Sequence, residues 1–383
     1  MTVTTGIPCI LGEELDMFRK SVRSFAQARL APGYLDRALD DSFPWDVYRE
    51  LAAQRLIGLE VSAEHGGQEA DHLAAGIACE EVARADFNAA YMVFASTLLG
   101  SLIERFSPLA ARLLPAVVRG ELKLCLGLTE PGSGSDAAAL ATRAVRDGDD
   151  YVLNGTKAFI SGGSISDLYV TMVRTGGAGA KGICCFVVEK GTRGLSFGKK
   201  ERKLGWNTQP TAMVNFEDSR VPVANRLGDE GDGFKIAMMG LDGGRLNVSA
   251  CSLGGARACL DAARDHLLER RQFDRPLAEF QALRFRLADM ATELDAARLM
   301  VRRGAVSLDQ GDPEATMHCA MAKRLATDAG FHICNEALQL FGGYGYLKDF
   351  PIERYLRDVR VHQILEGTNE IMRVIIARRL LGN

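Results

Sequence analysis

Residues 125–136 read Cys-Leu-Gly-Leu-Thr-Glu-Pro-Gly-Ser-Gly-Ser-Asp, and the character of the chain changes in the middle of this stretch. The alternating leucines, beginning with Leu124, indicate a short buried strand that stops at Pro131. Beyond it, Gly132 and Gly134 allow the backbone to turn tightly and another molecule to approach it closely. The hydroxyls and unpaired N–H groups of this loop are donors for an acceptor. A Gly/Ser loop is most often a simple turn, so the stretch alone leaves both a turn and a ligand-binding loop open.

The composition is typical of a soluble globular protein: 383 residues, 47% hydrophobic and 25% charged, enough for two or three domains. A net charge of −3 gives no electrostatic footprint for nucleic acid or a membrane surface. The six histidines lack metal-ligand spacing, and we expect no metal. We expect the nine cysteines, which form no Cys-x-x-Cys pair, to be reduced thiols. No apolar run approaches the roughly 20 residues of a membrane span. The early acidic residues Glu13, Glu14 and Asp16 are unlike a transit peptide, so we expect a cytoplasmic protein.

The spacing of apolar residues divides the chain into three parts. The first part follows helical spacing, and residues 73–106 are so rich in Ala, Leu and Met that we expect buried helix. The middle part has short β-branched and aromatic runs, with Asn154-Gly155 suited to a type I′ hairpin turn. The last part is helical, with a 4-3-4 apolar seam from Leu283 to Val301 suited to a helix bundle. We predict an α+β fold with an N-terminal all-helical domain (1–120), a middle antiparallel β-barrel or sandwich domain (121–227) and a C-terminal four-helix bundle domain (228–383).

A second string, Leu-Glu-Gly-Thr-Asn-Glu at residues 365–370, places a carboxylate at the end of a loop, directly before a predicted helix. Thr368 or Asn369 is suited to cap that helix. Glu366 then has two interpretations. It compensates the positive end of the helix dipole, which is a common surface role, or it is a general base.

Taken together, the two strings and the order helix–β–helix resemble the acyl-CoA dehydrogenase family, flavoenzymes that oxidise acyl-CoA thioesters, and the resemblance covers essentially the whole chain. It implies FAD as the cofactor. It implies that Glu366 removes the acyl α-proton while the β-hydride passes to flavin N5, with hydrogen bonds stabilising the developing enolate. Some relatives place the base at the position of Gly244, which has no side chain here, so Glu366 is the only base that the matching positions offer.

The resemblance also implies a set of FAD contacts. Phe159 would lie over the flavin ring and Ser161 near N5, whereas the residues from Arg270 to Gly343 would serve the FAD of a neighbouring subunit. Without the resemblance, these segments are an ordinary strand, a solvated helix end and a glycine C-cap. The implied contacts are Leu126, Leu128, Thr129, Ser135, Phe159, Ser161, Arg270, Gln272, Phe273, Phe280, Gln281, Gln339, Gly342, Gly343, Thr368 and Glu370.

For acyl-CoA, the resemblance implies a second set of contacts. Without the resemblance, Asp242 and Arg245 would be read as a helix cap and a surface charge at the start of the first bundle helix. Gly243 and Gly244 are expected to face the acyl group and leave room for a methyl branch; the alternative is that they only allow a close helix turn. The implied substrate contacts are Ser135, Asp242, Gly244, Arg245, Leu365 and Gly367.

Residues 181–234 and 240–254, with 157–161 and 342–349, look most similar to the isobutyryl-CoA dehydrogenase branch of the family. The expected reaction is isobutyryl-CoA to methacrylyl-CoA, as in valine catabolism, by a homotetramer built as a dimer of dimers with electron-transfer flavoprotein as acceptor. The alternatives are a short-chain or 2-methylbutyryl-CoA dehydrogenase, or an acyl-CoA oxidase. A catalytically idle binding protein like the family's DNA-associated relatives, which have basic surfaces, is disfavoured by the net charge of −3 and by Glu366.

Overall fold

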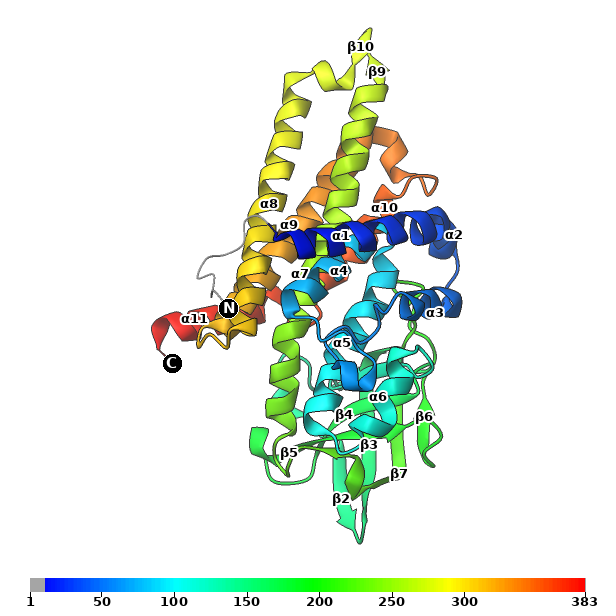
Figure 1. Cartoon of the computed structure of the whole chain (residues 1–383), viewed down its shortest axis with the longest axis vertical. Coiled ribbons are helices and arrows are strands. Elements are labelled where there is room, and N and C mark those ends of the chain that lie inside the picture. Colours follow the sequence, from blue (N-terminus) through cyan, green and yellow to red (C-terminus); the bar gives the residue numbers. More distant parts are fainter. Residues whose placement is uncertain (1–10, 383) are drawn as a thin grey trace.

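Helices form the N-terminal part of the computed structural model, which describes residues 11–382 (Figure 1). The expected apolar stretch 73–106 divides into two helices at Asp86, because the Asp86 side chain accepts hydrogen bonds from the N–H groups of Asn88 and Ala89 and caps the second helix. A π-helical segment, Ala26–Leu30, continues the first helix. The α-helices are α1 (Glu13–Phe25), α2 (Tyr34–Leu39), α3 (Trp45–Ala53), α4 (His72–Ala85), α5 (Phe87–Phe106) and α6 (Ala110–Val118).

Helix α5 has the length and apolar composition of a membrane span, so the expectation that no apolar run approaches that length was wrong. However, 89% of its apolar window is buried inside the fold, where it contacts α4, α6 and α7. The core helix of a globular protein passes the same test of length and composition. The burial identifies α5 as such a core helix.

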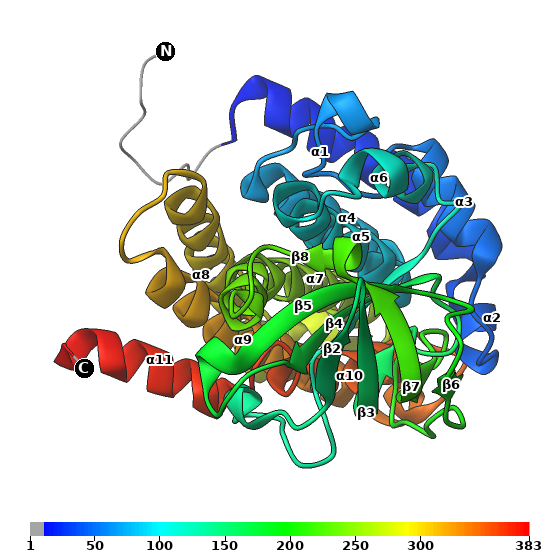
Figure 2. The same ribbon diagram turned by 90° about the horizontal axis from the view of Figure 1, so that it is seen from below.

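The middle part is a sheet, and in the described residues it has eight strands in the order β6-β7-β3-β2-β4-β5-β8, with β1 paired to β4 (Figure 2). Most pairs are antiparallel, as expected, but β1 runs parallel to β4, and β2 also meets β4 in parallel. The alternating side chains of β5 divide between two cores: Cys185 packs toward the helices and Cys184 toward the far side. The strands are β1 (Leu124–Gly127), β2 (Arg143–Asp147), β3 (Asp150–Ser161), β4 (Leu168–Arg174), β5 (Ile183–Glu189), β6 (Leu195–Phe197), β7 (Thr211–Pro222) and β8 (Arg226–Leu227).

The predicted hairpin turn at Asn154-Gly155 was wrong, because β3 continues through both residues. The tight turn lies earlier, where Asp147 of β2 pairs with Asp150 of β3 and Gly148 supplies the positive φ of 63°. At Asn154-Gly155 the register against β7 shifts by a β-bulge. Gly155 has a φ of 146°, and a side chain there would collide with Thr142.

The C-terminal part is built around α7, a helix of 37 residues that contacts α4, α5, α8, α9 and β5. The predicted seam on α8 is confirmed, since Met290, Leu294 and Ala297 are buried. Of the two predicted caps of α11, Thr368 and Asn369, the structure selects Thr368, whose hydroxyl accepts the Ile371 N–H. The elements are α7 (Gly233–Glu269), β9 (Arg271–Gln272), β10 (Arg275–Pro276), α8 (Gln281–Asp309), α9 (Ala315–Phe341), α10 (Ile352–Val359) and α11 (Asn369–Leu381).

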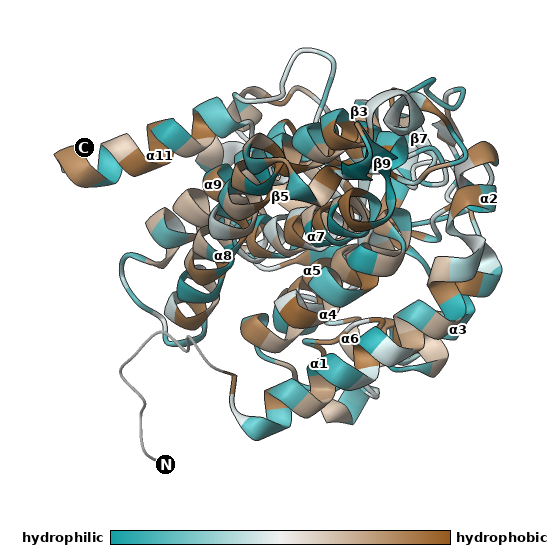
Figure 3. Cartoon of the chain, turned by 90° about the horizontal axis from the view of Figure 1, so that it is seen from above, coloured by the Kyte–Doolittle hydropathy of each residue, from teal (hydrophilic) through white to brown (hydrophobic). Residues whose placement is uncertain are grey.

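Seen from above, α4, α5 and α7 lie in the middle of the molecule, with α8 on one side and α1 and α3 on the other (Figure 3). Glycines on α7 allow this packing: a Cβ at Gly254 would collide with the Glu80 carbonyl oxygen of α4, and one at Gly240 would lie 2.8 Å from Leu102 of α5. The predicted α+β class and the helix–β–helix order are confirmed by this arrangement. The cysteines from Cys79 to Cys334 are free and buried, as expected.

Candidate active site

Glu366 lies in the short loop that leads into α11, and its backbone is strained. Its φ is 56°, in the left-handed region that non-glycine residues rarely adopt, and Gly367 follows with a φ of 86°. Two buried cations hold this backbone. The Arg245 Nε donates to the Glu366 carbonyl oxygen at 3.4 Å, and the Lys323 Nζ donates to the Gly367 carbonyl oxygen at 2.7 Å.

The Glu366 carboxylate lies in the interior rather than at the surface, where a group that only compensates a helix dipole is usually found. The residue keeps some exposed surface, but its Oε2 is buried and has no hydrogen-bond partner in the described part of the chain. Burial raises the pKa of Glu366 to about 7, while the positive charges of Arg245 and Lys323 act in the opposite direction. An unpartnered carboxylate with a pKa near neutrality is suited to act as a general base.

Gly244 forms the wall against which this carboxylate lies. A Cβ at Gly244 would be 2.5 Å from the Glu366 Oε2 and 3.5 Å from the Leu98 side chain of α5. Gly243, one residue earlier, faces the His72 ring of α4 at 3.4 Å instead. The expectation that both glycines face the acyl region was therefore wrong for Gly243, because consecutive residues of a helix point about 100° apart.

Asp242 and Arg245 reach the same loop from α7. They are buried in the interior of this helix, which begins at Gly233, so their expected position at the start of the first bundle helix was wrong. The alternative of a helix cap and a surface charge is excluded with it. Arg245 Nη1 donates to Asp242 Oδ1 at 2.7 Å, and Thr316 Oγ1 of α9 donates to Asp242 Oδ2 at 2.7 Å. The structure thus brings together six predicted residues: Glu366, Gly244, Asp242, Arg245, Leu365 and Gly367.

A second group lies where β1 ends beside β3. The Ala158 N–H donates to the Thr129 carbonyl oxygen at 2.8 Å, and the Lys157 Nζ donates to the Leu128 carbonyl oxygen at 3.2 Å. Phe159 sits at a register shift with a φ of 58° and is 69% exposed. A large aromatic ring presented on strained backbone beside an open strand end fits the flat ring of a flavin. Leu126 on β1 and Ser161 at the end of β3 belong to the same two strands, and Ser135 is exposed in the loop that follows β1.

A third group lies at the C-terminal end of α7, around the projecting β9–β10 hairpin (Figure 1). Glu366 lies instead beside Gly244, in the N-terminal third of the same helix. Phe273 in the β9–β10 hairpin is 87% exposed. The Arg270 guanidinium lies 5.5 Å from the centre of the Tyr344 ring, which joins the hairpin to the 3₁₀ turn Gly342–Tyr346. This end of the molecule collects eight predicted residues: Arg270, Gln272, Phe273, Phe280, Gln281, Gln339, Gly342 and Gly343. The last two of the predicted FAD contacts are Thr368 and Glu370. Thr368 caps α11, and the exposed Glu370 contacts Arg373.

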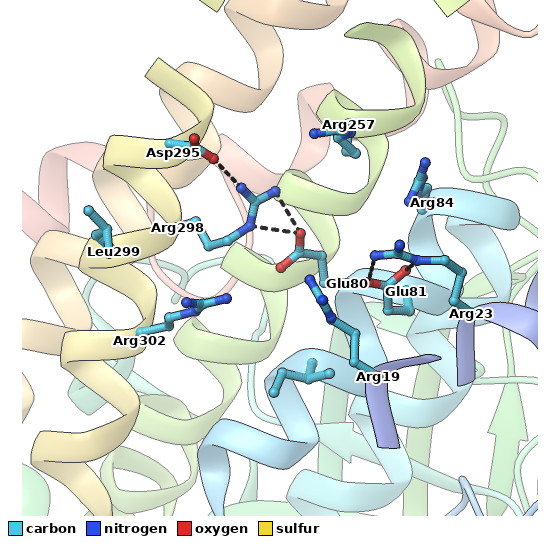
Figure 4. Close-up of a pocket in the computed structure, with 11 residues that line it drawn as sticks. Arg19, Arg23, Glu80, Glu81, Arg84, Arg257, Asp295, Arg298, Leu299 and Arg302 are labelled. Atoms are coloured by element: carbon cyan, nitrogen blue, oxygen red, sulfur yellow. Dashed lines mark hydrogen bonds and ion pairs between the residues drawn. The ribbon is translucent and has the colours of Figure 1, made fainter. Parts of the chain in front are cut away.

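A cavity of about 560 Å³ between α1, α4, α7 and α8 contains none of these residues (Figure 4). Its arginines are paired across the helices: Arg23 with Glu81 at 2.6 Å, and Arg298 with Glu80 at 2.8 Å. Asp261 of α7 binds a further two, Arg84 and Arg257. Six arginines line the cavity against three acids, Glu80, Glu81 and Asp295, so its lining keeps an excess of positive charge. We interpret the ion pairs as contacts that join the helices. Within residues 11–382, no three His, Cys, Asp or Glu side chains are placed to hold a metal ion.

Three family models match consecutive parts of the chain: the N-terminal (12–121), middle (125–219) and C-terminal (231–381) domains of acyl-CoA dehydrogenase. Mitochondrial isobutyryl-CoA dehydrogenase of Dictyostelium discoideum is 51% identical over 97% of this chain and 90% of that protein. The structure of butyryl-CoA dehydrogenase from Megasphaera elsdenii has a TM-score of 0.93 at 38% identity, over 97% of this chain and 99% of that one. A chain solved in work on the electron transferring flavoprotein of Acidaminococcus fermentans has a TM-score of 0.95 at 40% identity, over 98% and 99%.

The fold and these matches define an oxidoreductase that acts on CH–CH groups. The chain belongs to the acyl-CoA dehydrogenase family, as its sequence indicated. Members of this family are FAD-dependent flavoproteins. The groups around Phe159 and around Arg270 remain the predicted places for the cofactor.

Sequence reasoning missed three residues of this site: Lys323, Thr316 and Leu98. For Lys323 a signal was present. It is a single lysine on the buried, alanine-rich face of α9, between Ala320 and Ala326, and a lysine is almost never fully buried without a partner. Thr316 and Leu98 gave no signal, because a threonine near a helix start and a leucine in a core helix have ordinary structural roles.

Glu366→Gln is expected to stabilise the holoprotein at pH 8 but much less at pH 5. The carboxyl is protonated in both the folded and the unfolded state below pH 4.5, and its ionisation opposes folding increasingly as the pH rises to about 7. A pKa rise from 4.5 to about 7 corresponds to roughly 3 kcal/mol of folding free energy. Thermal unfolding of both proteins at the two pH values measures this difference. Equal melting temperatures at pH 8 would show that burial does not disfavour the Glu366 carboxylate.

Gly244→Ala is expected to lower turnover by at least about tenfold on branched and straight acyl-CoA alike, because its methyl group displaces the Glu366 carboxylate. The matched control is Gly76→Ala on α4, whose Cβ would lie 3.9 Å from Ala250 in ordinary contact. Initial rates with isobutyryl-CoA and butyryl-CoA measure the effect. A selective loss for the branched substrate would instead assign Gly244 to the methyl pocket.

Proposed function

We propose that this protein is an FAD-dependent dehydrogenase of a short branched acyl-CoA, converting isobutyryl-CoA to methacrylyl-CoA in the cytoplasm as a step of valine catabolism. The observation that carries the proposal is the buried, unpartnered Oε2 of Glu366 beside Gly244. The substrate is supported by the 51% identity to an isobutyryl-CoA dehydrogenase over nearly the whole chain. Enzymes this similar usually share a reaction, whereas chain-length preference depends on a few residues of the pocket.

In the proposed mechanism, bound FAD supplies the acceptor for the β-hydride. Leu126, Leu128, Thr129, Phe159 and Ser161 would hold its ring. The Oε2 of Glu366 takes the acyl α-proton, and bound substrate excludes water from the carboxylate and increases its basicity.

Arg245 and Lys323 favour the ionised form of Glu366, because their charges lower its pKa and partly offset the effect of burial. The backbone N–H of Glu366 would donate to the thioester oxygen, where negative charge develops. On α7, Asp242 is fixed by Arg245 and Thr316, and Ser135 lies in the exposed loop after β1. These side chains would orient the CoA portion.

The assembly that we propose is a homotetramer, a dimer of dimers, with electron-transfer flavoprotein as the electron acceptor. The third group supports it, because exposed Phe273 and the Arg270 region are far from Glu366 of the same chain and could reach the FAD of a neighbour. The alternatives are a short-chain or 2-methylbutyryl-CoA dehydrogenase and an acyl-CoA oxidase. Anaerobic bleaching of the flavin by different acyl-CoAs distinguishes the two alternative dehydrogenases from our proposal. Oxygen consumption distinguishes the oxidase.

The test is anaerobic flavin bleaching by isobutyryl-, butyryl- and 2-methylbutyryl-CoA, in wild type and Glu366→Gln. We expect isobutyryl-CoA to bleach the wild-type flavin fastest. In Glu366→Gln, which removes the base at nearly constant volume, bleaching should be slower by at least about a thousandfold. FAD content from the visible spectrum is the control. Similar bleaching rates in the two proteins would place the base elsewhere.

Arg270→Glu is expected to weaken FAD retention, and more strongly at low protein concentration, if Arg270 serves a neighbour's cofactor. The control is Arg146→Glu, which changes an exposed arginine of β2, a strand at the opposite end of the molecule from the β9–β10 hairpin (Figure 1). FAD content and light-scattering mass are measured together over a dilution series. A monomer with full FAD content would contradict both the shared site and the tetramer.

A further inference from the structure

Lys323 of α9 is a buried cation whose position is fixed by one short segment of chain. Its side chain is 0% exposed and lies on a helix face with Ala320 and Ala326. Its Nζ donates to the Gly367 carbonyl oxygen at 2.7 Å and to Asn369 Oδ1 at 2.9 Å. A buried ammonium group needs such partners, because leaving it unpaired in an apolar core is very unfavourable.

Both acceptors of Lys323 lie directly after Glu366, and the rest of the loop is held from the same helix. Asp328 Oδ1, one turn beyond Lys323, accepts from Gln363 Nε2 at 2.7 Å and from Asn369 Nδ2 at 2.7 Å. The two ends of the loop are therefore attached to Asp328. Lys323 holds its middle, at the carbonyl that follows the strained Glu366.

We propose that Lys323 is a positioning residue for the reaction: it fixes the Gly367 carbonyl and thereby keeps the Glu366 carboxylate against Gly244, where the α-proton is removed. This inference rests on the proposed role of Glu366 as the base. Positioning of this kind matters, because a misplacement of about 1 Å in a catalytic group can cost about a hundredfold in rate. Lys323 itself makes no contact with the carboxylate atoms in the described structure, and it acts through the backbone and through its charge.

The charges around this loop set its pH dependence. Glu366 is influenced by Arg245 from α7 and by Lys323 from α9, and the Tyr91 hydroxyl approaches it from α5. Lys323 in turn is influenced by Glu366, Arg245, Asp328 and by Glu370 of α11, and it lies near the buried His362.

Burial lowers the pKa of Lys323 to about 8 and raises that of Glu366 to about 7. The arrangement that we propose, an ionised Glu366 beside a protonated Lys323, is therefore most populated between these two values. Flavin reduction should follow a bell-shaped pH profile with its maximum in this range.

The test compares Lys323→Met with Thr327→Val in the FAD-loaded protein. Thr327 lies one turn further on α9 and also bonds Asn369, at 3.2 Å, but does not contact Gly367. For Lys323→Met we expect flavin reduction by isobutyryl-CoA to be slower by about ten- to a hundredfold, with KM changed little. The acidic limb of the profile should move to higher pH by about one unit, because a positive charge that favours the ionised carboxylate is lost. Thr327→Val should change the rate of flavin reduction by less than about twofold. It should move the acidic limb of the pH profile by no more than a few tenths of a pH unit.

A measurement independent of turnover is hydrogen–deuterium exchange of the peptide covering residues 364–368. Lys323→Met should make this peptide exchange faster than in the wild type, whereas Thr327→Val should not. Lys323→Gln, which keeps one donor for Asn369, is the second variant and carries the same expectations. Wild-type exchange and an unmoved pH profile in either lysine variant would overturn the proposal.

The outcomes separate this inference from the proposed function. If Glu366→Gln reduces flavin normally, the base is elsewhere and the proposed function fails, whatever the exchange data show. If Glu366→Gln is inactive but the lysine variants behave as wild type, only the positioning role fails. If neither lysine variant keeps FAD and a wild-type melting transition, Lys323 is a structural residue and the proposal is overturned.

Discussion

The close approach of other elements to helix α7 is the constraint on which the rest of the structure depends. Its glycines take the place of side chains at each contact: Gly233 against Cys184 of β5, Gly240 against Leu102 of α5, and Gly254 against the α4 backbone. Tight contacts of this kind bring the sheet and both helical parts onto one helix. Gly244 likewise allows a close approach, in this case by the candidate active-site residue: the Glu366 carboxylate occupies the space that a side chain at Gly244 would fill. Fold and site thus use one structural principle.

The Glu366 loop is stabilised by its surroundings against its own preferences. The residue has a left-handed backbone and a buried carboxylate oxygen without a hydrogen-bond partner in the described residues, and each of these features opposes folding. Arg245 and Lys323 compensate by binding the two carbonyl oxygens rather than the carboxylate. The outcome is a carboxyl group with a pKa of about 7, which suits the base that we propose. A direct salt bridge would have stabilised the protein more, but it would have lowered the pKa and made the carboxylate a poor proton acceptor.

Much of this fold could be predicted from the sequence, because apolar spacing separates helix from strand over long segments. The α8 seam and the Thr368 cap follow from periodicity and side-chain chemistry alone. Asn154-Gly155 misled, because such a dipeptide is compatible with both a turn and a bulge, and the pairing of β3 with β7 decides between them. Asp242 and Arg245 were expected at the start of the first bundle helix, but tertiary contacts continue α7 through Gly243 and Gly244, although glycine has a low helix propensity.

The residues of the candidate site also differ in how far the sequence could predict them, because some depend on local sequence and others on how distant elements pack. Glu366 could be proposed from the sequence because its string is a local feature that resembles the family's base. That Gly243 faces His72, and that Lys323 supports the loop from a helix more than 40 residues earlier, depend on how helices pack, which local spacing does not encode. Residues that act through others are therefore the ones that a motif leaves out. The same reasoning applies to the exposed hairpin at Phe273: the Phe273 ring is 87% exposed, and its contacts within the chain, with Phe280, leave most of it open to a neighbouring molecule. If this hairpin completes a neighbour's flavin site, as we propose, then the loss of assembly and the loss of cofactor are the same event.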